Sequence, residues 1–392
     1  MTSPTYSQSK NVPVTEEEAR NAGIETPDWK RLLGQFGRQP NRLEVEMLLR
    51  SWAGDCSARE AQIFLRSVFR SAPSVVQESF GRTGAVDIGF GEAVVLSVAS
   101  GAREGRLAYS EGVVASASLA SREMAVLGAR PHTMSYFSRS GSAESATTTR
   151  RLHEALRGSS RAARMLGSTL ADEQIYFHAR YENDAVVWCG LAGLVDRDSI
   201  PTVNAPTGND LFVYLGEETV CAADSRGHAR LIPDDPFRSS QLSYIVANLR
   251  VREMFRDIQP VGPGGLCHAL MQFATRRRHG LRLHIDNVPL YRPGAPFDHV
   301  LFQESPGRYL ALVPAEGFRR LNELLVRSGY IATQIGEVLQ DRVVEVATQH
   351  RTVSSIPLTA LVDETAVQSA DLLLYPPMLY RGTSEEQQAP TS

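Results

Sequence analysis

Residues 36–59 decide how the rest of this sequence is interpreted. They read Phe36-Gly37-Arg38-Gln39-Pro40-Asn41, then Arg42-Leu43-Glu44-Val45-Glu46-Met47-Leu48-Leu49-Arg50, then Ser51-Trp52-Ala53-Gly54-Asp55-Cys56-Ser57-Ala58-Arg59. After the Gly-Arg-Gln-Pro-Asn turn, the apolar residues Leu43, Met47 and Leu48 recur at the spacing of an α-helix. The stretch therefore predicts a turn followed by an amphipathic helix, with Asp55 and Cys56 just beyond it.

Length and composition are typical of a folded chain with two domains. The chain has 392 residues, of which 42% are hydrophobic, and this is enough to bury a full core. It contains no apolar run long enough to cross a membrane, and its first residues lack the apolar core of a signal peptide. We therefore expect a soluble, cytoplasmic protein without membrane contact.

The charged residues argue against nucleic acid as a partner and limit the chemistry. The net charge is −3, and the triplet Arg276-Arg277-Arg278 is too short to indicate a nucleic-acid site. Lys10 and Lys30 are the only lysines, and both are expected to precede the folded core. Schiff-base chemistry and a P-loop lysine are therefore excluded, so anions must be held by arginine, backbone amides or metal.

Metal and disulfide frameworks are not expected either. The four cysteines, Cys56, Cys189, Cys221 and Cys267, are far apart and form no Cys-x-x-Cys pair. None of the nine histidines lies in a His-x-x-x-His or His-Glu-x-x-His motif, so a dedicated zinc site is not predicted.

The order of patterns along the chain predicts five segments. They are a flexible tail at residues 1–30 with a short helix capped at Thr15, a helical module at 31–80, an N-terminal α/β domain at 81–203, a C-terminal domain at 204–375 and a disordered tail at 376–392. The boundary between the domains is placed at the Pro/Gly/Asn-rich residues 201–209. Helices and strands alternate without a regular βαβ rhythm, so an α+β fold with mixed β-sheets is predicted.

Individual elements follow from periodicity. Strands are expected at residues 93–98, 133–137, 174–180, 185–195, 210–215, 281–285, 308–313, 331–338 and 342–346. Helices are expected at 111–127, 150–166, 239–255 and 318–328, and another runs from the glycines at 262–265 to residue 278.

Several motifs resemble, in the same order, those of formylglycinamidine ribonucleotide synthetase, the ATP-dependent amidine-forming enzyme of purine synthesis. They are the Gly-Arg-x-Pro-Asn turn with Trp52, Cys56 and Ser57, then Asp87-Ile88-Gly89-x-Gly91, Leu127-Gly128-Ala129-Arg130-Pro131, Asp235-Pro236-Phe237, Gly262-x-Gly264-Gly265-Leu266 and Gln303-Glu304-Ser305-Pro306-Gly307-Arg308. One glycine pair alone is a weak signal, but collinear motifs over residues 30–350 make the chain similar to this family along most of its length.

The resemblance implies a helical N-terminal segment followed by one two-domain, AIR-synthetase-like pair. The full synthetase carries two such pairs on one chain. The resemblance also implies that its active-site cleft forms where sheets from two halves meet, so a single half is expected to expose an apolar sheet surface. We expect this chain to close that surface as a two-fold homodimer.

The chain departs from the family at positions that carry its chemistry. The resemblance implies that ATP phosphorylates an amide oxygen and that ammonia then displaces phosphate, which needs Mg²⁺, phosphate donors and an acid/base group. Asp55 replaces the family's catalytic His, residues 97–104 lack its Lys, Glu and two His, and Gln174 and Pro260 replace two further carboxylates. Losing one acid/base group costs about 10²–10⁴-fold in rate, so the parent reaction is not expected.

Three sets of site residues are predicted from the resemblance. The catalytic set is Asp55, Cys56 and Arg59, the nucleotide-binding set is Asp87, Gly89, Gly91, Arg122, Asp235, Gly262, Gly264 and Gly265, and the Mg²⁺ ligands are Glu123 and Glu173. Two carboxylates suffice for Mg²⁺ when substrate phosphates complete its shell. Glycine turns let phosphate approach backbone amides closely.

Each candidate also has a structural interpretation. Asp55 is either an acid/base group or a solvated residue at a helix end, and Cys56 is either a nucleophile or a core thiol. Tight backbone turns explain the glycines equally well. The arginine-rich helix at 150–166 either faces an anionic substrate or is a solvated face.

The leading hypothesis is a member of this family repurposed for a biosynthetic reaction on an amide- or carboxylate-bearing small molecule, with ATP and Mg²⁺ as cofactors. Two alternatives stay open. One is a non-catalytic partner in a heteromeric complex, and the other is an ATP-independent enzyme that uses the inherited cleft with Asp55 as acid or base.

Overall fold

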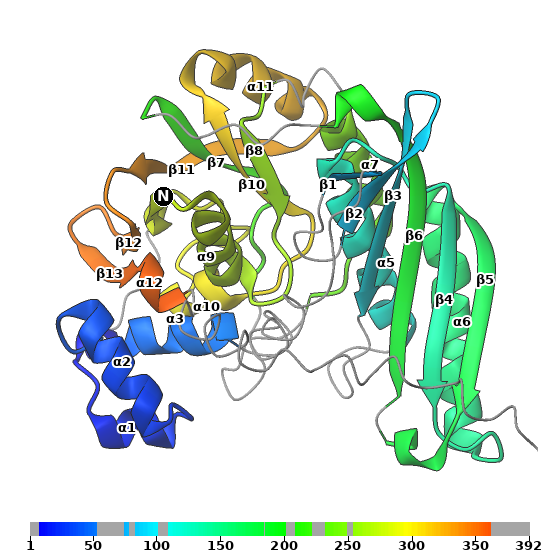
Figure 1. Cartoon of the computed structure of the whole chain (residues 1–392), viewed down its shortest axis with the longest axis horizontal. Helices are drawn as coiled ribbons and strands as arrows, with labels where there is room; N and C mark the ends of the chain where they lie inside the picture. The colour runs from blue at the N-terminus through cyan, green and yellow to red at the C-terminus, as the bar shows by residue number, and fades with distance from the viewer. Residues whose placement is uncertain are drawn as a thin grey trace, which may run out of the picture.

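The computed structural model of the chain describes residues 8–52, 74–77, 83–100, 109–183, 185–200, 208–221, 232–248 and 254–361. Within these residues the strands form one sheet of six strands and one of seven. The two sheets lie on opposite sides of the molecule, and the N-terminal helices lie below the seven-stranded sheet (Figure 1). The predicted mixture of separate helices and mixed sheets is confirmed.

The six-stranded sheet comes from the first half of the chain. Its order is β1 (Val75–Gln77), β2 (Thr83–Gly89), β3 (Glu92–Ser100), β6 (Val186–Asp196), β4 (Thr133–Ser140) and β5 (Thr169–Phe177). β4 and β5 are parallel, and the other neighbours are antiparallel. Burial alternates along β3, where Ala93, Val95 and Ala99 are buried and Leu96 and Val98 are exposed. One face is therefore packed and the other is open.

Two helices cover the packed face of this sheet. They are α5 (Tyr109–Val126) and α6 (Ala146–Leu166), whose apolar residues share one core with β3, β4 and β6. Ser145 caps α6, and Gly167 ends it in the left-handed conformation at φ 66°. The C-terminal end of α5 also reaches the other half of the chain, because Ala125 packs into the core beside the seven-stranded sheet.

The seven-stranded sheet has helices on both faces. Its order is β13 (Thr352–Pro357), β12 (Val343–Ala347), β9 (Gly280–His284), β11 (Ile331–Leu339), β7 (Asp210–Gly216), β10 (Arg308–Pro314) and β8 (Asp257–Pro260). One core contains α9 (Gly265–Arg277), α10 (Phe297–Phe302) and α12 (Leu358–Leu361), and another contains α7 (Pro236–Ala247) and α11 (Ala315–Arg327). Short 3₁₀ turns are η1 (Gln8–Asn11), η2 (Ala179–Tyr181), η3 (Arg197–Ser199) and η4 (Ile285–Asn287).

The N-terminal helices belong to the folded core. They are α1 (Glu16–Asn21), α2 (Thr26–Phe36) and α3 (Arg42–Trp52). Ala19, Ile24 and Trp29 are buried in the same core as α9. The prediction of a flexible tail at residues 1–30 is therefore wrong for residues 8–30, because their apolar side chains pack against the second half of the chain.

Two observations refine this correction. The predicted cap is confirmed, since Thr15 and Glu18 form a reciprocal capping box at the start of α1. Lys10, expected to precede the core, forms an ion pair with Glu46 on α3. The predicted tails at residues 1–7 and 376–392 lie outside the described residues.

The other elements follow the predictions with identifiable exceptions. The helix predicted at 239–255 is observed as α7, which starts earlier, at Pro236, and ends at Ala247. The strands predicted at 174–180 and 185–195 are not neighbours, because β4 lies between β5 and β6. β1, β2, β8 and β13 were not predicted: β1, β8 and β13 are short segments without clear alternation, and β2 runs into the Asp87-Ile88-Gly89-x-Gly91 motif.

No helix among the described residues combines the length and the apolar character needed to cross a lipid bilayer.

Candidate functional site

The Gly-Arg-Gln-Pro-Asn turn is a structural clamp. Gly37 ends α2 in the left-handed region at φ 64°, where glycine is favoured. Arg38 donates from Nη1 and Nη2 to both oxygens of the wholly buried Glu44 carboxylate, at 2.8 and 2.6 Å. Glu44 also accepts the backbone N–H groups of Asn41 and Ser355. One carboxylate thus joins the turn, α3 and β13.

α3 carries the chain from this clamp towards the predicted catalytic segment. Asp55, Cys56 and Arg59 lie outside the described residues, so their roles stay predictions. In the last turn of α3, Ser51 Oγ lies 3.5 Å from Nδ1 of His268 on α9. The last turn of α3 therefore lies beside α9. The sequence does not single out His268, because an isolated histidine outside any ligand spacing gives no signal.

A buried ion-pair network joins the two halves of the chain between α5 and α7. Arg122 on α5 is only 4% exposed and donates from Nη1 to Asp234 Oδ2 at 2.8 Å and to Ser239 Oγ at 3.1 Å. Ser239 in turn donates to Asp234 Oδ1 at 2.6 Å. Arg122 Nε is buried and has no hydrogen-bond partner among the described residues. This guanidinium thus keeps one unused donor in the interior.

The predicted candidate Asp235 lies next to this network and acts as a helix cap. Its carboxylate accepts the backbone N–H groups of Phe237 and Arg238 at the start of α7. Asp234, one residue earlier, is the partner of Arg122. Sequence reasoning chose the motif residue and missed Asp234, because two adjacent carboxylates give no signal of which one faces α5.

A second buried arginine adds positive charge near Arg122. Arg308, at the start of β10, is fully buried and donates to the carbonyl oxygens of Gln303 and Ser305 and to the Thr219 hydroxyl, at 2.6 to 3.2 Å. These three acceptors are uncharged. Burial lowers the pKa of Arg308, and the nearby charge of Arg122 lowers it further. Asp234 therefore pairs with Arg122, whereas the acceptors of Arg308 among the described residues carry no charge.

The glycine-rich loop before α9 lies against the middle of α5. A Cβ at Gly262 would stand 3.2 Å from Leu119 Cδ1. Gly264 has φ 80°, and its N–H donates to Glu304 Oε1 at 2.9 Å. A Cβ at Gly265 would come within 2.8 Å of two backbone carbonyl oxygens. Glycine is required at Gly262 and Gly265 because neighbouring atoms leave little room for a Cβ, and at Gly264 because of its positive φ. The Glu304 carboxylate lies at the N-terminal end of α9, where the helix dipole favours anions.

Glu123 and Glu173 do not meet. Thr83 Oγ1 on β2 lies 3.1 Å from Glu123 Oε2 and 2.8 Å from Ser97 Oγ on β3. Glu173 is exposed on β5, and two strands separate β5 from β3. At about 4.8 Å per strand, β5 lies roughly 14 Å from β3, and β2, whose Thr83 contacts Glu123, lies beyond β3. The prediction that both hold one Mg²⁺ ion is therefore wrong, because the strand order was not readable from the sequence.

The Asp-Ile-Gly-x-Gly motif forms the tip of the β2–β3 hairpin, away from the buried network. Asp87 accepts the Gly89 N–H at 2.7 Å and pairs with Arg197 at 3.1 Å. Gly89 and Gly91 have φ 88° and 79°, and Phe90 between them is fully exposed. The tip projects at the upper right of Figure 1. Turn geometry accounts for these glycines, and the structure does not bring this motif to Arg122.

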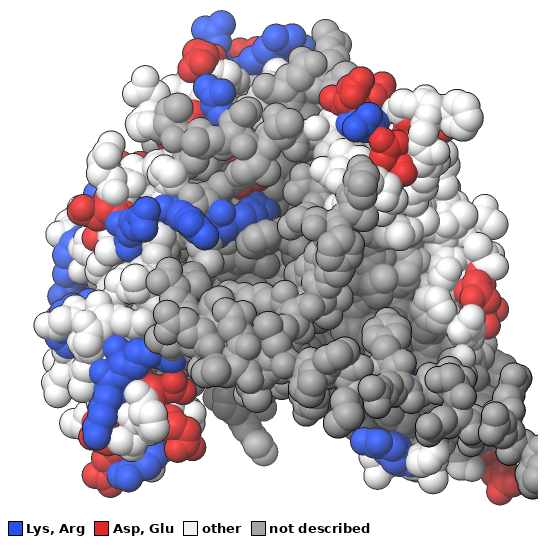
Figure 2. All heavy atoms as spheres, viewed as in Figure 1, with Lys and Arg blue, Asp and Glu red and all other residues white. Residues whose placement is uncertain are grey.

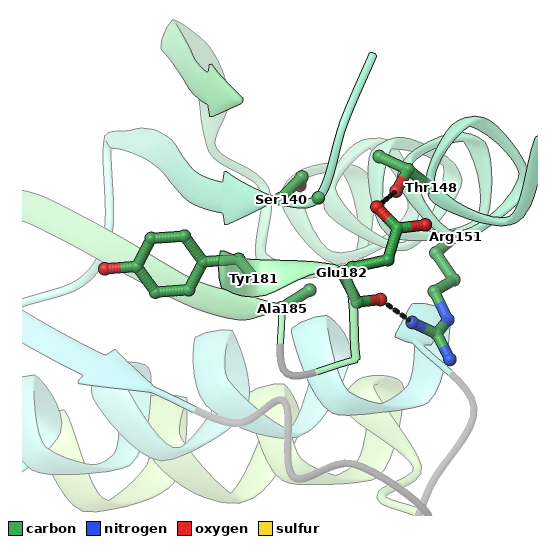
Figure 3. Close-up of a pocket in the computed structure, with 7 residues that line it drawn as sticks. Ser140, Thr148, Arg151, Tyr181, Glu182 and Ala185 are labelled. Atoms are coloured by element: carbon green, nitrogen blue, oxygen red, sulfur yellow. Dashed lines mark hydrogen bonds between the residues drawn. The ribbon is translucent and has the colours of Figure 1, made fainter. Parts of the chain in front are cut away.

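A small pocket at the start of α6 is filled by a carboxylate of the chain itself. Glu182 accepts hydrogen bonds from the Ser142 N–H at 2.8 Å, the Ser145 hydroxyl and the Thr148 hydroxyl, and its backbone oxygen accepts from Arg151 (Figure 3). The hydrogen bond from Ser145 is the largest cause that lowers the pKa of Glu182. The pocket ties the β5–β6 connection to α6.

Comparison with solved structures identifies the fold class. PurL of Thermotoga maritima complexed with ATP superposes with a TM-score of 0.73 at 19% identity, over 86% of this chain and 55% of that one. A chain of the HypE–HypF complex superposes with a TM-score of 0.54 at 12% identity, over 69% of this chain and 92% of that one. The chain has the AIR-synthetase-like α+β fold.

Comparison of sequences gives the family. The AIR synthase related protein C-terminal domain matches residues 218–349. The PurL subunit of phosphoribosylformylglycinamidine synthase from Thermomicrobium roseum is 25% identical over 366 residues, which are 90% of this chain and 50% of that protein. The chain is similar to PurL along most of its own length and spans about half the length of the curated relatives it matches. The resemblance drawn from the motifs is confirmed.

Proposed function

We propose that this chain is a PurL-like enzyme repurposed for a biosynthetic reaction on an amide- or carboxylate-bearing small molecule, with a nucleotide bound where α5, α7 and the loop before α9 meet. The buried excess of positive charge at this junction supports the proposal. Arg122 pairs with Asp234 and keeps an unpartnered Nε, and the nearby buried Arg308 has only uncharged acceptors among the described residues. Buried cations without counterions are costly, and a phosphate group supplies the missing charge. PurL of T. maritima was solved in complex with ATP.

In this proposal the protein groups act on the phosphates. The Arg122 guanidinium donates to phosphate oxygens, and the loop at residues 262–265 lies against the same helix, α5. A Mg²⁺ ion fits the Glu123 carboxylate, which Thr83 orients. Among the described residues no three His, Cys, Asp or Glu side chains are placed together so that they could hold a metal ion, so phosphate oxygens and water would complete its shell. A bound Mg²⁺ ion would neutralise part of the phosphate charge.

The acid/base role is proposed for Asp55, in the position of the family's catalytic His, with Cys56 and Arg59 beside it in sequence. A carboxylate exchanges protons near neutral pH when its surroundings raise its pKa. This difference from the family supports a changed reaction on a related substrate class.

Calorimetric titration of the whole chain with ADP and Mg²⁺ tests the nucleotide site. We expect saturable binding, weakened about tenfold or more in Arg122→Lys, because lysine keeps the charge and loses the planar fork of donors. Arg150→Gln, an exposed arginine on α6, is the matched control and should bind as the unmodified chain does. A folded chain that gives no saturable heat with ADP or ATP would refute the nucleotide-dependent function.

We also propose a homodimer closed through the open face of the six-stranded sheet. Val86, Ile88, Leu96, Val98 and Leu194 are 36 to 50% exposed there. The right-hand part of Figure 2, over β4, β5 and β6, shows few charged side chains. A second copy presents the same apolar face, so a two-fold arrangement would cover both faces at once.

The same face supports a second candidate function, that of a non-catalytic partner in a heteromeric complex. An apolar face fits a different half as well as a second copy, and the HypE–HypF structure shows a similar fold within a complex of two proteins. Stable co-purification with a distinct chain, together with no turnover by either alone, would favour this function. Turnover by the isolated chain would reject it.

A further inference from the structure

One end of the open sheet face carries aromatic rings and arginines that the proposed function does not use. Phe137 on β4 and Trp188 on β6 are register partners, and Arg139 on β4 is the register partner of Tyr176 on β5. Tyr181, in the 3₁₀ turn η2, stands beside them. We call these five residues, together with Arg180, the aromatic–arginine platform.

The rings of the platform are open to solvent. Tyr176 is 62% exposed, and Phe137, Trp188 and Tyr181 are half-buried. The two helices α5 and α6 lie on the opposite face of the sheet, so none of the described helices covers these rings. Adjacent ring faces on neighbouring strands form a flat surface of the kind on which planar ring systems stack.

Two cations converge on one ring in this platform. The Cζ atoms of Arg139 and Arg180 lie 5.9 and 5.3 Å from the ring centroid of Tyr181. Arg139 Cζ is also 5.9 Å from the Trp188 ring, and its Nη1 donates to the Tyr181 hydroxyl at 3.1 Å. The cation–π contacts fix the position of the Arg139 guanidinium and leave its other N–H donors for a ligand.

The two cations of the platform have no ion-pair partner among the described residues. Neither Arg139 nor Arg180 forms an ion pair with a described carboxylate, whereas Arg197, Arg238 and Arg282 elsewhere on the surface all do. Two like charges held near one ring repel each other, and an anion between them removes that repulsion. A planar guanidinium matches carboxylate and phosphate oxygens in a bidentate geometry.

We infer that the aromatic–arginine platform binds a planar aromatic ring that carries an anionic group, either a carboxylate or a phosphate. The ring stacks on Trp188 and Phe137, and the anion accepts hydrogen bonds from Arg139 and Arg180. This site is separate from the nucleotide site at the α5–α7 junction, and it borders the apolar patch through which a second copy is proposed to pack.

The indole N–H signal of Trp188 in a ¹⁵N-labelled full chain tests this inference. The chain has three tryptophans, so Trp188→Phe identifies the signal. Phenyl phosphate and benzoate are the probes. Two fragments are the controls: inorganic phosphate, which lacks the ring, and phenol, which lacks the charge. We expect a saturable shift with at least one probe, at an affinity about tenfold or more above that of either fragment, because stacking and charge act together. A response to phenyl phosphate alone assigns a phosphate ligand, and a response to benzoate alone assigns a carboxylate ligand.

Arginine variants distinguish binding at the platform from general electrostatic attraction of anions to the protein surface. Arg139→Gln and Arg180→Gln should each weaken binding about tenfold, since each removes a charge-assisted hydrogen bond. Arg150→Gln on α6 should leave it unchanged. Arg180 is exposed, so its variant tests the site even if Arg139→Gln fails to fold. Equal affinity for probe and fragments, or unchanged binding in both platform variants, would overturn the inference. So would a Trp188 signal that responds to protein dilution alone, because a second copy then covers the platform.

Discussion

Glu44 is wholly buried, yet in the sequence it is one of several charged residues on an amphipathic helix. Its carboxylate receives two N–H groups from Arg38 and one each from the backbones of Asn41 and Ser355. The last of these donors comes from β13, 311 residues further along the chain. The Gly-Arg-Gln-Pro-Asn turn therefore fixes the position of α3 against β13.

Glu44→Ala should lower the free energy of unfolding by about 2–4 kcal/mol, because it leaves buried donors without an acceptor. The midpoint of urea denaturation measures the change. Glu17→Gln, an exposed glutamate on α1, is the control and should shift the midpoint little. A Glu44→Ala midpoint equal to that of the control would contradict the clamp.

The hydrogen bonds of Glu182 predict that its contribution to thermal stability depends on pH. Hydrogen bonds from Ser145 and Ser142 lower its pKa in the folded chain, so its contribution to stability is present above the unfolded pKa, near 4.5, and is lost as the pH falls through the folded value. Glu182→Gln should therefore lower the melting temperature at pH 7, and the difference from the unmodified chain should shrink below about pH 4.5. Melting temperatures at pH 7 and pH 3.5 measure this. A difference that stays constant or grows towards pH 3.5 contradicts the assigned pKa shift.

At the scale of elements, α5 links the two sheets. It covers the six-stranded sheet along its length, and its Arg122 reaches Asp234 in the residue pair that precedes α7. The backbone oxygen of Arg122 also accepts a hydrogen bond from Tyr309 on β10 at 3.3 Å. The sequence predicts the helix from its apolar positions, but the residue that α5 meets in the second half depends on how the halves pack.

Asp234→Asn should destabilise the chain by about 3–5 kcal/mol, because it leaves the buried Arg122 charge unpaired. Asp235→Asn is a closely matched control, since asparagine caps a helix as well as aspartate. Thermal and urea unfolding of the two variants measure the difference. If the variants unfold alike, the Arg122–Asp234 pair does not hold the halves together. Arg122→Met combined with Asp234→Leu should recover stability, because the pair is then removed as a unit.

At the scale of the whole molecule, the two sheets differ in how they are covered. Helices lie on both faces of the seven-stranded sheet, whereas the six-stranded sheet exposes Leu96, Val98 and Leu194 on its open face. Apolar exposure of this kind marks an interface. The open face of the six-stranded sheet is therefore where a partner is expected.

Leu96→Lys combined with Val98→Lys should convert the proposed dimer to a monomer at micromolar concentration, because lysines opposite an apolar face leave charges desolvated. Light scattering coupled to size-exclusion chromatography measures the mass. Val326→Lys, at an exposed valine on α11, is the control and should leave the mass unchanged. An unmodified chain that is already monomeric at that concentration would contradict the homodimer.

The sequence by itself determined the ancestry, most helices and strands and the α+β class, because helix periodicity, strand alternation and glycine turns act within a few neighbouring residues. It also selected Arg122 and the glycines at 262–265, which the structure brings to one junction. Only the tertiary structure decided that Asp234 is the partner of Arg122, that Glu123 and Glu173 lie apart, and that residues 8–30 are packed. The physical reason is that strand order and the pairing of buried charges depend on contacts between segments far apart in the chain. A local sequence pattern does not indicate which of two adjacent carboxylates forms such a contact, or at which end of a sheet a strand lies.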